Sequence, residues 1–376
     1  MIDHLNGQSK TFNNLVAIAN RFKPDGQIVN IQQYGSGNIN NTFLVTLDLA
    51  TEPLFILQRL NTKVFCQPKL VMSNICIFSD YVGQKLHQSM IVDNRRWEVP
   101  RVLLTKDAQN HWLENDGSFW RAMSFIVNSQ SFDQIQDPKH GQEIGYGLGM
   151  FHHLISDLPV EQLADTLAGF HITPSYLQHY DRILTTIDSH QSPEVNYCLK
   201  LISARSNLAH VLENAKVEGK LKMRTIHGDP KINNIMIDRL SGQAVAMIDL
   251  DTVKPGLIHY DIGDCLRSGC NPLGEETPEW EQVSFEPELA QVILQGYLAV
   301  AQDFLTENDY DYIYDSIRLL TFELGLRFFT DYLAGNVYFK AGYAEHNLAR
   351  ALVQFKLMES IESQSGAIGK IIQDMR

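Results

Sequence analysis

Apolar and polar residues alternate along several short runs in the first third of the chain, at the two-residue period of a β-strand. This pattern predicts five strands, at residues 28–34, 42–47, 53–60, 99–105 and 119–127. The first two flank the loop 35–41, which is rich in Gly and Asn and typical of a hairpin. Two other stretches, 9–22 and 68–84, repeat apolar residues at helical spacing. We therefore expect a small sheet with two packing helices at the start of the chain.

Helical spacing dominates the remainder of the chain. Apolar stripes run through residues 141–158 and 174–217, and again through the C-terminal third. The first of these helices contains Gly145, Gly147 and Gly149, which do not follow a strand and so do not form a dinucleotide-binding turn. No Gly-x-x-x-x-Gly-Lys-Ser/Thr motif is present, which excludes a Walker-type phosphate loop.

One stretch, residues 225–252, returns to the strand pattern. An apolar run leads into His227-Gly-Asp229, a tight loop ends at Asn234, and a β-branched run passes through a Ser-Gly turn to a second apolar run ending at Asp249. We expect two short strand pairs that bring these polar groups to one end of a small sheet. The alternative is a hairpin with local turns, since Asp and Asn also favour turns for hydrogen-bonding reasons.

This grouping suits phosphoryl transfer, in which catalysis is mainly positioning and charge neutralisation. Asp229 would act as the base that orients the accepting hydroxyl. Asn234 and Asp249 would hold Mg²⁺ on the phosphates, because amide and carboxylate oxygens are ligands that this ion prefers. The three positions therefore predict a magnesium-dependent phosphotransferase.

The composition narrows the class of protein. The 376-residue chain carries 31 Lys and Arg against 44 Asp and Glu, a formal net charge of −13, which argues against a nucleic-acid partner. Its five cysteines are scattered and include no Cys-x-x-Cys pair, which fits a reducing cytoplasm. No run approaches the ~18 apolar residues of a membrane span, and the N-terminus shows no export signal. We expect a cytoplasmic enzyme without a membrane partner.

The spacing His-Gly-Asp-x-x-x-x-Asn followed by Ile-Asp resembles the aminoglycoside phosphotransferase and choline kinase superfamily. The resemblance implies an α+β, two-lobed protein-kinase-like fold. A small antiparallel β-sheet would form an N-terminal nucleotide-binding lobe at residues 1–127. A large, mainly helical C-terminal lobe at 128–376 would carry the catalytic loop and the acceptor site. ATP and Mg²⁺ are the implied cofactors, and a small molecule is the implied acceptor.

The nucleotide half of the expected site departs from the kinase pattern. The loop Gly35-Ser36-Gly37 could close over phosphates, because glycines leave backbone N–H groups free to point at oxygens, although it could equally be only a hairpin. Kinase-like folds place a Lys or Arg on the third strand and pair it with a Glu on the next helix. Here that position is Gln58, with Arg59 on the opposite face of the strand.

The helix after this strand also lacks the usual acid. Its only acidic residue is Asp80, and it contains no Glu. Either Arg59 or Lys63 swings in toward the phosphates, or the loop and the metal hold the nucleotide alone. The missing Lys–Glu pair also leaves open a pseudokinase that binds nucleotide without turnover.

Longer runs resemble one branch of the superfamily, the N-acetylhexosamine 1-kinases. These runs include Phe55-Ile-Leu-Gln-Arg-Leu60, Ile248-Asp-Leu-Asp-Thr-Val253 and Arg327-Phe-Phe-Thr-Asp-Tyr-Leu-Ala-Gly335. The resemblance implies transfer of the γ-phosphate to a sugar hydroxyl, C1 of an N-acetylhexosamine or related hexose. It places Thr252, Arg327 and Tyr338 near the sugar. Ser268 stands where an aromatic residue is expected in the branch, so an amino alcohol or an aminoglycoside-type acceptor stays open.

Three further expectations concern support of the site. Asp261 should anchor the catalytic loop through backbone N–H groups rather than touch substrate. Glu323, Arg327 and Asp331 follow each other at i, i+4, a spacing typical of exposed ion pairs, unless Arg327 projects into a cleft wall. His152 should be a packing or surface residue, because no acidic partner is visible at useful spacing.

Overall fold

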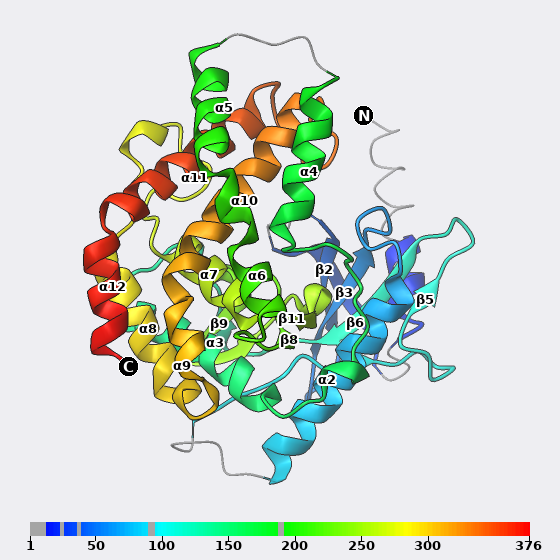
Figure 1. The fold of residues 1–376 in the computed structure, drawn as a ribbon. Coiled ribbons are helices and arrows are strands. Elements are labelled where there is room, and N and C mark those ends of the chain that lie inside the picture. The colour runs from blue at the N-terminus through cyan, green and yellow to red at the C-terminus, as the bar shows by residue number, and fades with distance from the viewer. Residues whose placement is uncertain (1–12, 23–25, 36–38, 89–94, 187–191) are drawn as a thin grey trace. The chain divides into compact units, whose positions relative to one another are not determined.

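The computed structural model describes residues 13–22, 26–35, 39–88, 95–186 and 192–376. The chain forms two compact units, Met1–Asn128 and Ser129–Arg376 (Figure 1). The first is built on one sheet, whereas the second is mainly helical, so the chain is of the α+β class.

The sheet of the first unit is antiparallel throughout. Its strands follow the order β1-β2-β3-β6-β4, and β5 pairs with β6. The strands are β1 (Ile28–Gln33), β2 (Asn41–Leu47), β3 (Leu54–Leu60), β4 (Val102–Leu103), β5 (Trp112–Leu113) and β6 (Phe119–Ser124). Helix α2 (Pro68–Gln88) and a helical stretch at 13–19 complete the unit. The part of the predicted first helix before residue 13 lies outside the described residues.

Alternation along the strands assigns the two faces of this sheet. Phe55 and Leu57 of β3 pack with Trp120 of β6 and with Ile18 in one buried apolar cluster. Because successive side chains point to opposite faces, Gln58 lies on the other face. The buried face explains why the alternating pattern identified these strands.

Two predicted strands are shorter than expected. The run 99–105 pairs only at Val102–Leu103, since Pro100 has no N–H and the N–H of Arg101 donates to the Ser124 hydroxyl. Strand β6 ends at Ser124, and Asn128 then turns the chain with a φ of 54°, which asparagine tolerates.

The second unit consists of helices around short strand pairs. Its main helices are α3 (Pro138–Ile155), α4 (Thr173–Leu184), α5 (Pro193–Arg205), α6 (Val211–Val217), α7 (Ile258–Gly269), α8 (Pro287–Ala301), α9 (Glu307–Asp311), α10 (Ile313–Leu333), α11 (His346–Ser363) and α12 (Ser365–Asp374). Its strands are β7 (Ser129–Gln130), β8 (Arg224–Ile226), β9 (Ile235–Asp238), β10 (Ala244–Met247) and β11 (Lys254–Gly256). The predicted two strand pairs are present as β8 with β11 and β9 with β10.

Helices α3 and α8 pack backbone against backbone. A Cβ on Gly145 would lie 1.8 Å from the carbonyl oxygen of Ile293, and one on Gly296 would lie 1.8 Å from that of Gln142. Only glycine permits this approach. Gly145 is therefore a packing residue, and α3 also contacts β9 and β10.

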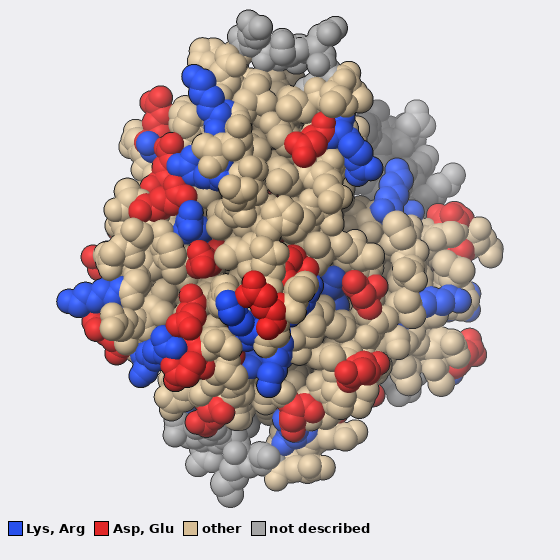
Figure 2. Space-filling model, viewed as in Figure 1, with Lys and Arg blue, Asp and Glu red and all other residues tan. Residues whose placement is uncertain are grey.

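Helix α10 is central to the second unit and contacts α4, α7 and α11 (Figure 1). Its residues Phe322 and Phe329 belong to an apolar cluster with Phe355 of α11. On the face shown in Figure 2, basic and acidic side chains are interspersed. None of the helices within the described ranges combines the length and apolar character that crossing a membrane requires.

Candidate active site

The loop between β8 and the short 3₁₀ helix Ile232–Asn234 carries the His-Gly-Asp motif. Gly228 has a φ of 86°, and a Cβ there would lie 2.8 Å from the carbonyl oxygen of Thr252. Both the left-handed conformation and the close approach require glycine. The turn thereby places Asp229 directly after a buried strand end.

Asp261, at the start of α7, holds this turn. Its two carboxylate oxygens accept hydrogen bonds from the backbone N–H of His227 at 2.7 Å and of Gly228 at 2.8 Å. The side chain is fully buried, so each bond forms away from competing water. The prediction that Asp261 anchors the loop is confirmed.

His152 completes this anchor; it is buried, as expected of a packing residue, but the expectation that it lacks an acidic partner is wrong. Its Nε2 lies 2.9 Å from Asp261 Oδ2 and its Nδ1 lies 3.0 Å from the hydroxyl of Tyr297. The acidic partner that seemed missing in the sequence is 109 positions away along the chain. His152 is therefore a buried support of the loop, in contact with the residue that holds it.

His227 is buried and neutral. Its Nε2 donates to the carbonyl oxygen of Ile248 at 2.9 Å, and its Nδ1 accepts from the N–H of Asp229 at 3.3 Å. Burial lowers the pKa of His227 below its ordinary value, against the attraction of nearby carboxylates. The ring joins the catalytic loop to the chain just before Asp249.

Asn234 links the segments that carry Asp229 and Asp249 through its side-chain amide and its backbone carbonyl. The Asn234 amide donates to the carbonyl oxygen of Asp229 at 2.8 Å, and the carbonyl of Asn234 accepts the N–H of Ile248 at 2.9 Å. Asp249 then adopts a left-handed conformation, with a φ of 62° and a ψ of 55°. Residues held in such conformations cluster at functional sites.

The donor set at this position fits Mg²⁺. The Asn234 amide nitrogen donates within the loop, so its amide oxygen is the atom that could meet a metal ion, and the exposed Asp249 carries a carboxylate. Mg²⁺ in nucleotide sites uses one or two carboxylate or amide oxygens and completes its shell with phosphates and water. Among the described residues, no group of three or more His, Cys, Asp or Glu side chains is arranged to hold a metal.

Lys231 is a site residue that the sequence reading left without a role. Its Nζ lies 3.1 Å from Asp229 Oδ2, and both side chains are partly exposed. The Asp229 carboxylate raises the pKa of Lys231 above its ordinary value, so the ammonium group stays charged beside the expected base. The position of Lys231, two residues after Asp229 in the sequence, was an indication that the two side chains could lie close together.

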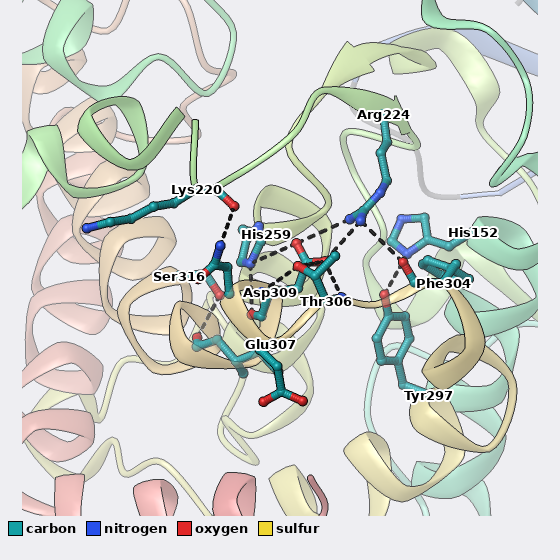
Figure 3. Close-up of polar contacts among 12 residues, drawn as sticks. His152, Lys220, Arg224, His259, Tyr297, Phe304, Thr306, Glu307, Asp309 and Ser316 are labelled. Atoms are coloured by element: carbon teal, nitrogen blue, oxygen red, sulfur yellow. Dashed lines mark hydrogen bonds and ion pairs between the residues drawn. The ribbon is translucent and has the colours of Figure 1, made fainter. Parts of the chain in front are cut away.

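Arg224 of strand β8 belongs to a cluster of ion pairs and hydrogen bonds (Figure 3). Arg224 donates to both carboxylate oxygens of Asp309, at 3.2 and 2.9 Å, and to the carbonyl of Phe304 at 3.3 Å. Asp309 also closes a capping box with Thr306 at the start of α9. His259 donates to the Asp309 carbonyl at 3.0 Å, and burial lowers the pKa of His259 to about 4.

Arg327 of α10 lies among aromatic side chains from before and within α4 and from the segment after α10. Its guanidinium carbon is 4.9 Å from the ring centre of Tyr176, 5.3 Å from Phe170, 5.4 Å from Phe339 and 6.0 Å from Tyr338. Such distances permit cation–π attraction. The Arg327 side chain therefore packs among aromatic rings and is not part of a row of exposed ion pairs.

The other two charges of the i, i+4 series are buried, contrary to the exposed ion pairs that the spacing suggested. Glu323 is 1% exposed and Asp331 is 5% exposed. Asp331 accepts the backbone N–H groups of Val337 at 2.9 Å and Tyr338 at 2.8 Å through Oδ1, and that of Phe339 at 2.9 Å through Oδ2. It thus shapes the turn that presents the half-exposed Tyr338.

Thr252 supports the catalytic loop directly. Its hydroxyl donates to the carbonyl oxygen of His227 at 2.7 Å, and the residue is 9% exposed. A contact with an acceptor, which the resemblance implied for Thr252, stays a prediction. Ser268 donates within its own helix to the Cys265 carbonyl at 3.2 Å.

In the first unit, Arg121 lies beside the position where a phosphate-binding lysine was expected. Gln58 pairs across the strands with Arg121, and the Arg121 Nε donates to Gln58 Oε1 at 2.9 Å. The Gln58 amide in turn donates to the Thr42 hydroxyl at 3.0 Å. Arg121 is 2% exposed, whereas Arg59 is exposed. Of the predicted loop, Gly35 is described, with a φ of 75°, and residues 36–38 lie outside the described residues.

The sequence offered a signal for Arg121 but none for His171. An arginine inside the mainly apolar run 119–127 is unusual for a buried strand. His171 precedes α4 with no periodic context, and only the structure shows that it contacts Glu323 and Gly228.

Solved structures with a similar fold are phosphotransferases. An aminoglycoside phosphotransferase from Alicyclobacillus acidocaldarius matches over 96% of this chain and 95% of its own, with a TM-score of 0.60 at 15% identity. A choline kinase from Cryptosporidium parvum matches over 91% of both chains, with a TM-score of 0.57 at 13% identity. A spectinomycin phosphotransferase, solved with ADP and spectinomycin, covers 94% of this chain and 98% of its own, with a TM-score of 0.55 at 12% identity. The kinase-like α+β fold is therefore confirmed.

The sequence itself also matches a family model over residues 82–307, more than half of the chain. That region contains the loop with Asp229, Asn234 and Asp249, and the Asp261 that holds it. The chain belongs to the phosphotransferase enzyme family.

Proposed function

We propose that this protein is an ATP-dependent kinase that transfers the γ-phosphate to a hydroxyl group of a sugar, with C1 of an N-acetylhexosamine or related hexose as the first candidate. The observation that carries the proposal is the loop geometry. Asn234 and Asp249 carry amide and carboxylate oxygens in the same loop region as Asp229. The side-chain amide of Asn234 donates to the Asp229 carbonyl, and the Ile248 N–H donates to the Asn234 carbonyl, which holds these segments together.

In this proposal Asp229 orients the sugar hydroxyl and accepts its proton as the new O–P bond forms, while the bond between the γ-phosphorus and the β–γ bridging oxygen breaks and ADP leaves. A metal ion held by Asn234 and Asp249 would neutralise charge on the phosphates. Lys231 adds a fixed positive charge 3.1 Å from the base, where it can meet an oxygen of the transferring group. Neutral His227 and buried Asp261 keep the loop in one conformation throughout.

The charges of the second unit favour a neutral acceptor over a cationic one. Asp264 is paired with Arg267, whose Nε and Nη2 lie 2.9 and 2.8 Å from its Oδ1. Glu323 is paired with His171 and Asp331 with backbone N–H groups. The aromatic cluster that could surround an ammonium group already contains Arg327. A sugar, which offers hydroxyls rather than charge, suits Arg donors and an exposed Tyr338 ring.

For the nucleotide, the proposal assigns the phosphate-facing charge to Arg121, with Gln58 orienting its guanidinium and the Gly35–Gly37 loop covering the phosphates. The support is the hydrogen-bonded chain Arg121–Gln58–Thr42 on one face of the sheet, in which Arg121 is buried. An arginine bound by Gln58 is already oriented, so less conformational entropy is lost on binding.

A panel of acceptors tests the proposal. ATP consumption is measured with free sugars, amino alcohols and aminoglycosides, and the product is examined by ³¹P NMR for coupling to the anomeric proton. Turnover with an N-acetylhexosamine and an anomeric phosphate is the expected result. Turnover only with amino compounds would replace the sugar assignment, and a silent panel with measurable ATP binding would identify a binding protein.

A further inference from the structure

His171 is a buried histidine with an unusual backbone and two short ring contacts. It is 4% exposed and has a φ of 63°, in the left-handed region. Its Nε2 lies 2.8 Å from the carbonyl oxygen of Gly228, and its Nδ1 lies 2.9 Å from Glu323 Oε1. The ring therefore bridges the catalytic loop and helix α10.

Both acceptors lack a hydrogen, which determines the state of the ring. A carbonyl oxygen and an ionised carboxylate can only accept, so both ring nitrogens must donate. Burial opposes this charge, but Glu323 and the Gly228 carbonyl outweigh it and raise the pKa of His171. For Glu323, burial is likewise outweighed by His171, Arg327 and Thr173, and its pKa is lowered. The two contacts and both pKa directions fit an imidazolium paired with a carboxylate.

The surroundings of His171 preserve this state. From α7, Asp264 adds negative charge and the Tyr260 ring stacks on the imidazole at 5.3 Å and 27°. From α10, Arg327 Nη1 lies 3.8 Å from Glu323 Oε1. From α4, Tyr176 lies beside Arg327 and the backbone of His171.

Glu323 is held on its second oxygen as well. Thr173, at the start of α4, donates its hydroxyl to Glu323 Oε2 at 2.7 Å. The carboxylate thus contacts His171, Thr173 and Arg327 at once. The same carboxylate that supports the catalytic loop also supports the arginine expected at the acceptor.

We propose that His171, as an imidazolium held by Glu323, is a positioning residue that fixes the Gly228 carbonyl and so aligns Asp229 with the acceptor side of α10. Nothing about this role requires His171 to touch substrate. The proposal deepens the kinase assignment and rests on it where activity is concerned. Its structural half, a charged ring between Gly228 and Glu323, stands apart from the identity of the acceptor.

The first test needs no substrate. In ¹⁵N-labelled protein, an NMR titration should show the His171 ring losing its second proton at a pH above the ordinary histidine pKa of about 6.5, and Glu323→Gln should lower that pH. A His171 ring in the parent that loses its second proton at or below the ordinary histidine pKa overturns the proposal.

The second test is a pH profile of kcat and KM. Because the active form is protonated, activity should be present at low pH and lost as the pH rises through the His171 pKa. Glu323→Gln removes the carboxylate, so the alkaline limb should move at least about one unit lower, which is about tenfold at a fixed pH on that limb. The KM for ATP should stay within about twofold of the parent, since α10 contributes no expected nucleotide contact.

Controls separate positioning from general destabilisation. Glu362→Gln removes a carboxylate that pairs with Arg205 and Arg318 and should leave the profile unchanged. His171→Gln should lower kcat without an alkaline limb in this range. A Glu323→Gln profile that superimposes on the parent overturns the proposal. If no acceptor in the panel were phosphorylated, the kinase assignment would be rejected. The NMR titration of His171 would then still test whether its ring is charged between Gly228 and Glu323.

Discussion

Substitution Asp261→Asn probes the anchor of the catalytic loop with little change in shape. In the parent, one buried carboxylate accepts the N–H groups of His227 and Gly228 and contacts His152 Nε2. An asparagine amide keeps one oxygen but turns an NH₂ group toward a second donor. Asp261 Oδ2 serves two of the three donors, so no orientation of the amide satisfies all of them.

The expected size of this effect follows from the contacts. A hydrogen bond to a charged group contributes about 1.5–3 kcal/mol, and a buried donor left unpaired costs about 1–3 kcal/mol more. Asp261→Asn should therefore lower the free energy of unfolding by about 3–5 kcal/mol. For a unit of this size the melting temperature should fall by about 2–4 °C per kcal/mol. Loss of loop alignment should also reduce kcat by about 10- to 100-fold.

Urea unfolding followed by circular dichroism measures the stability change, and steady-state kinetics at saturating ATP measures the activity. Asp311→Asn is the matched control, because Asp311 makes a largely exposed ion pair with Arg376 and should change stability by less than about 1 kcal/mol. If Asp261→Asn matched this control in both stability and kcat, the anchoring role derived from the geometry would be refuted.

Three further predictions concern the loop, the nucleotide and pH. Gly228→Ala forces a φ of 86° on alanine and a Cβ 2.8 Å from the Thr252 carbonyl, so unfolding should become about 1–3 kcal/mol easier and kcat should fall; equal stability would contradict the strain argument. Arg121→Met should raise the KM for ATP about tenfold while the matched variant Arg59→Met leaves it near the parent value, and the reverse order would reject Arg121. The stability lost in His171→Gln should be large near pH 6 and shrink above the raised His171 pKa, because that group's contribution is present below its unfolded value and lost as the pH rises; a pH-independent loss in urea unfolding would refute the ion pair.

Local patterns predicted the elements that carry the loop, because alternation and helical spacing follow directly from which face is buried. The run 53–60 formed a strand at Leu54–Leu60, and the run 141–158 formed a helix at Pro138–Ile155. Boundaries were less accurate where polar side chains intervened, as at Ser124. The Ser124 hydroxyl accepts a hydrogen bond from the Arg101 N–H, and the periodicity of the sequence does not predict such a side-chain contact.

The loop was predictable and its supports were not, for a physical reason. Asp229, Asn234 and Asp249 lie within one short stretch, so their spacing alone brings them together. His152 and Asp261 are 109 positions apart, and His171 and Glu323 are 152 apart. Such pairs form only when α3, α7 and α10 pack around the strands.

The prediction of exposed charges on helix α10 was also wrong, because the sequence does not show which elements pack around that helix. The i, i+4 spacing of Glu323 and Asp331 is that of an exposed ladder, but α10 is surrounded by other helices and both acids are buried. Buried acids then found partners outside their own helix, in His171 and in the N–H groups of 337–339. Tertiary packing decided what local spacing left open.

Comparison of Asp229→Asn with the parent tests the central claim most directly. Both proteins are given Mg-ATP and an N-acetylhexosamine, with ATP affinity measured separately by calorimetry and Asp311→Asn as the control. The proposed mechanism predicts that Asp229→Asn binds ATP like the parent but loses at least about a thousandfold in kcat. Turnover by Asp229→Asn within a few fold of the parent would contradict Asp229 as the base and the mechanism built on it.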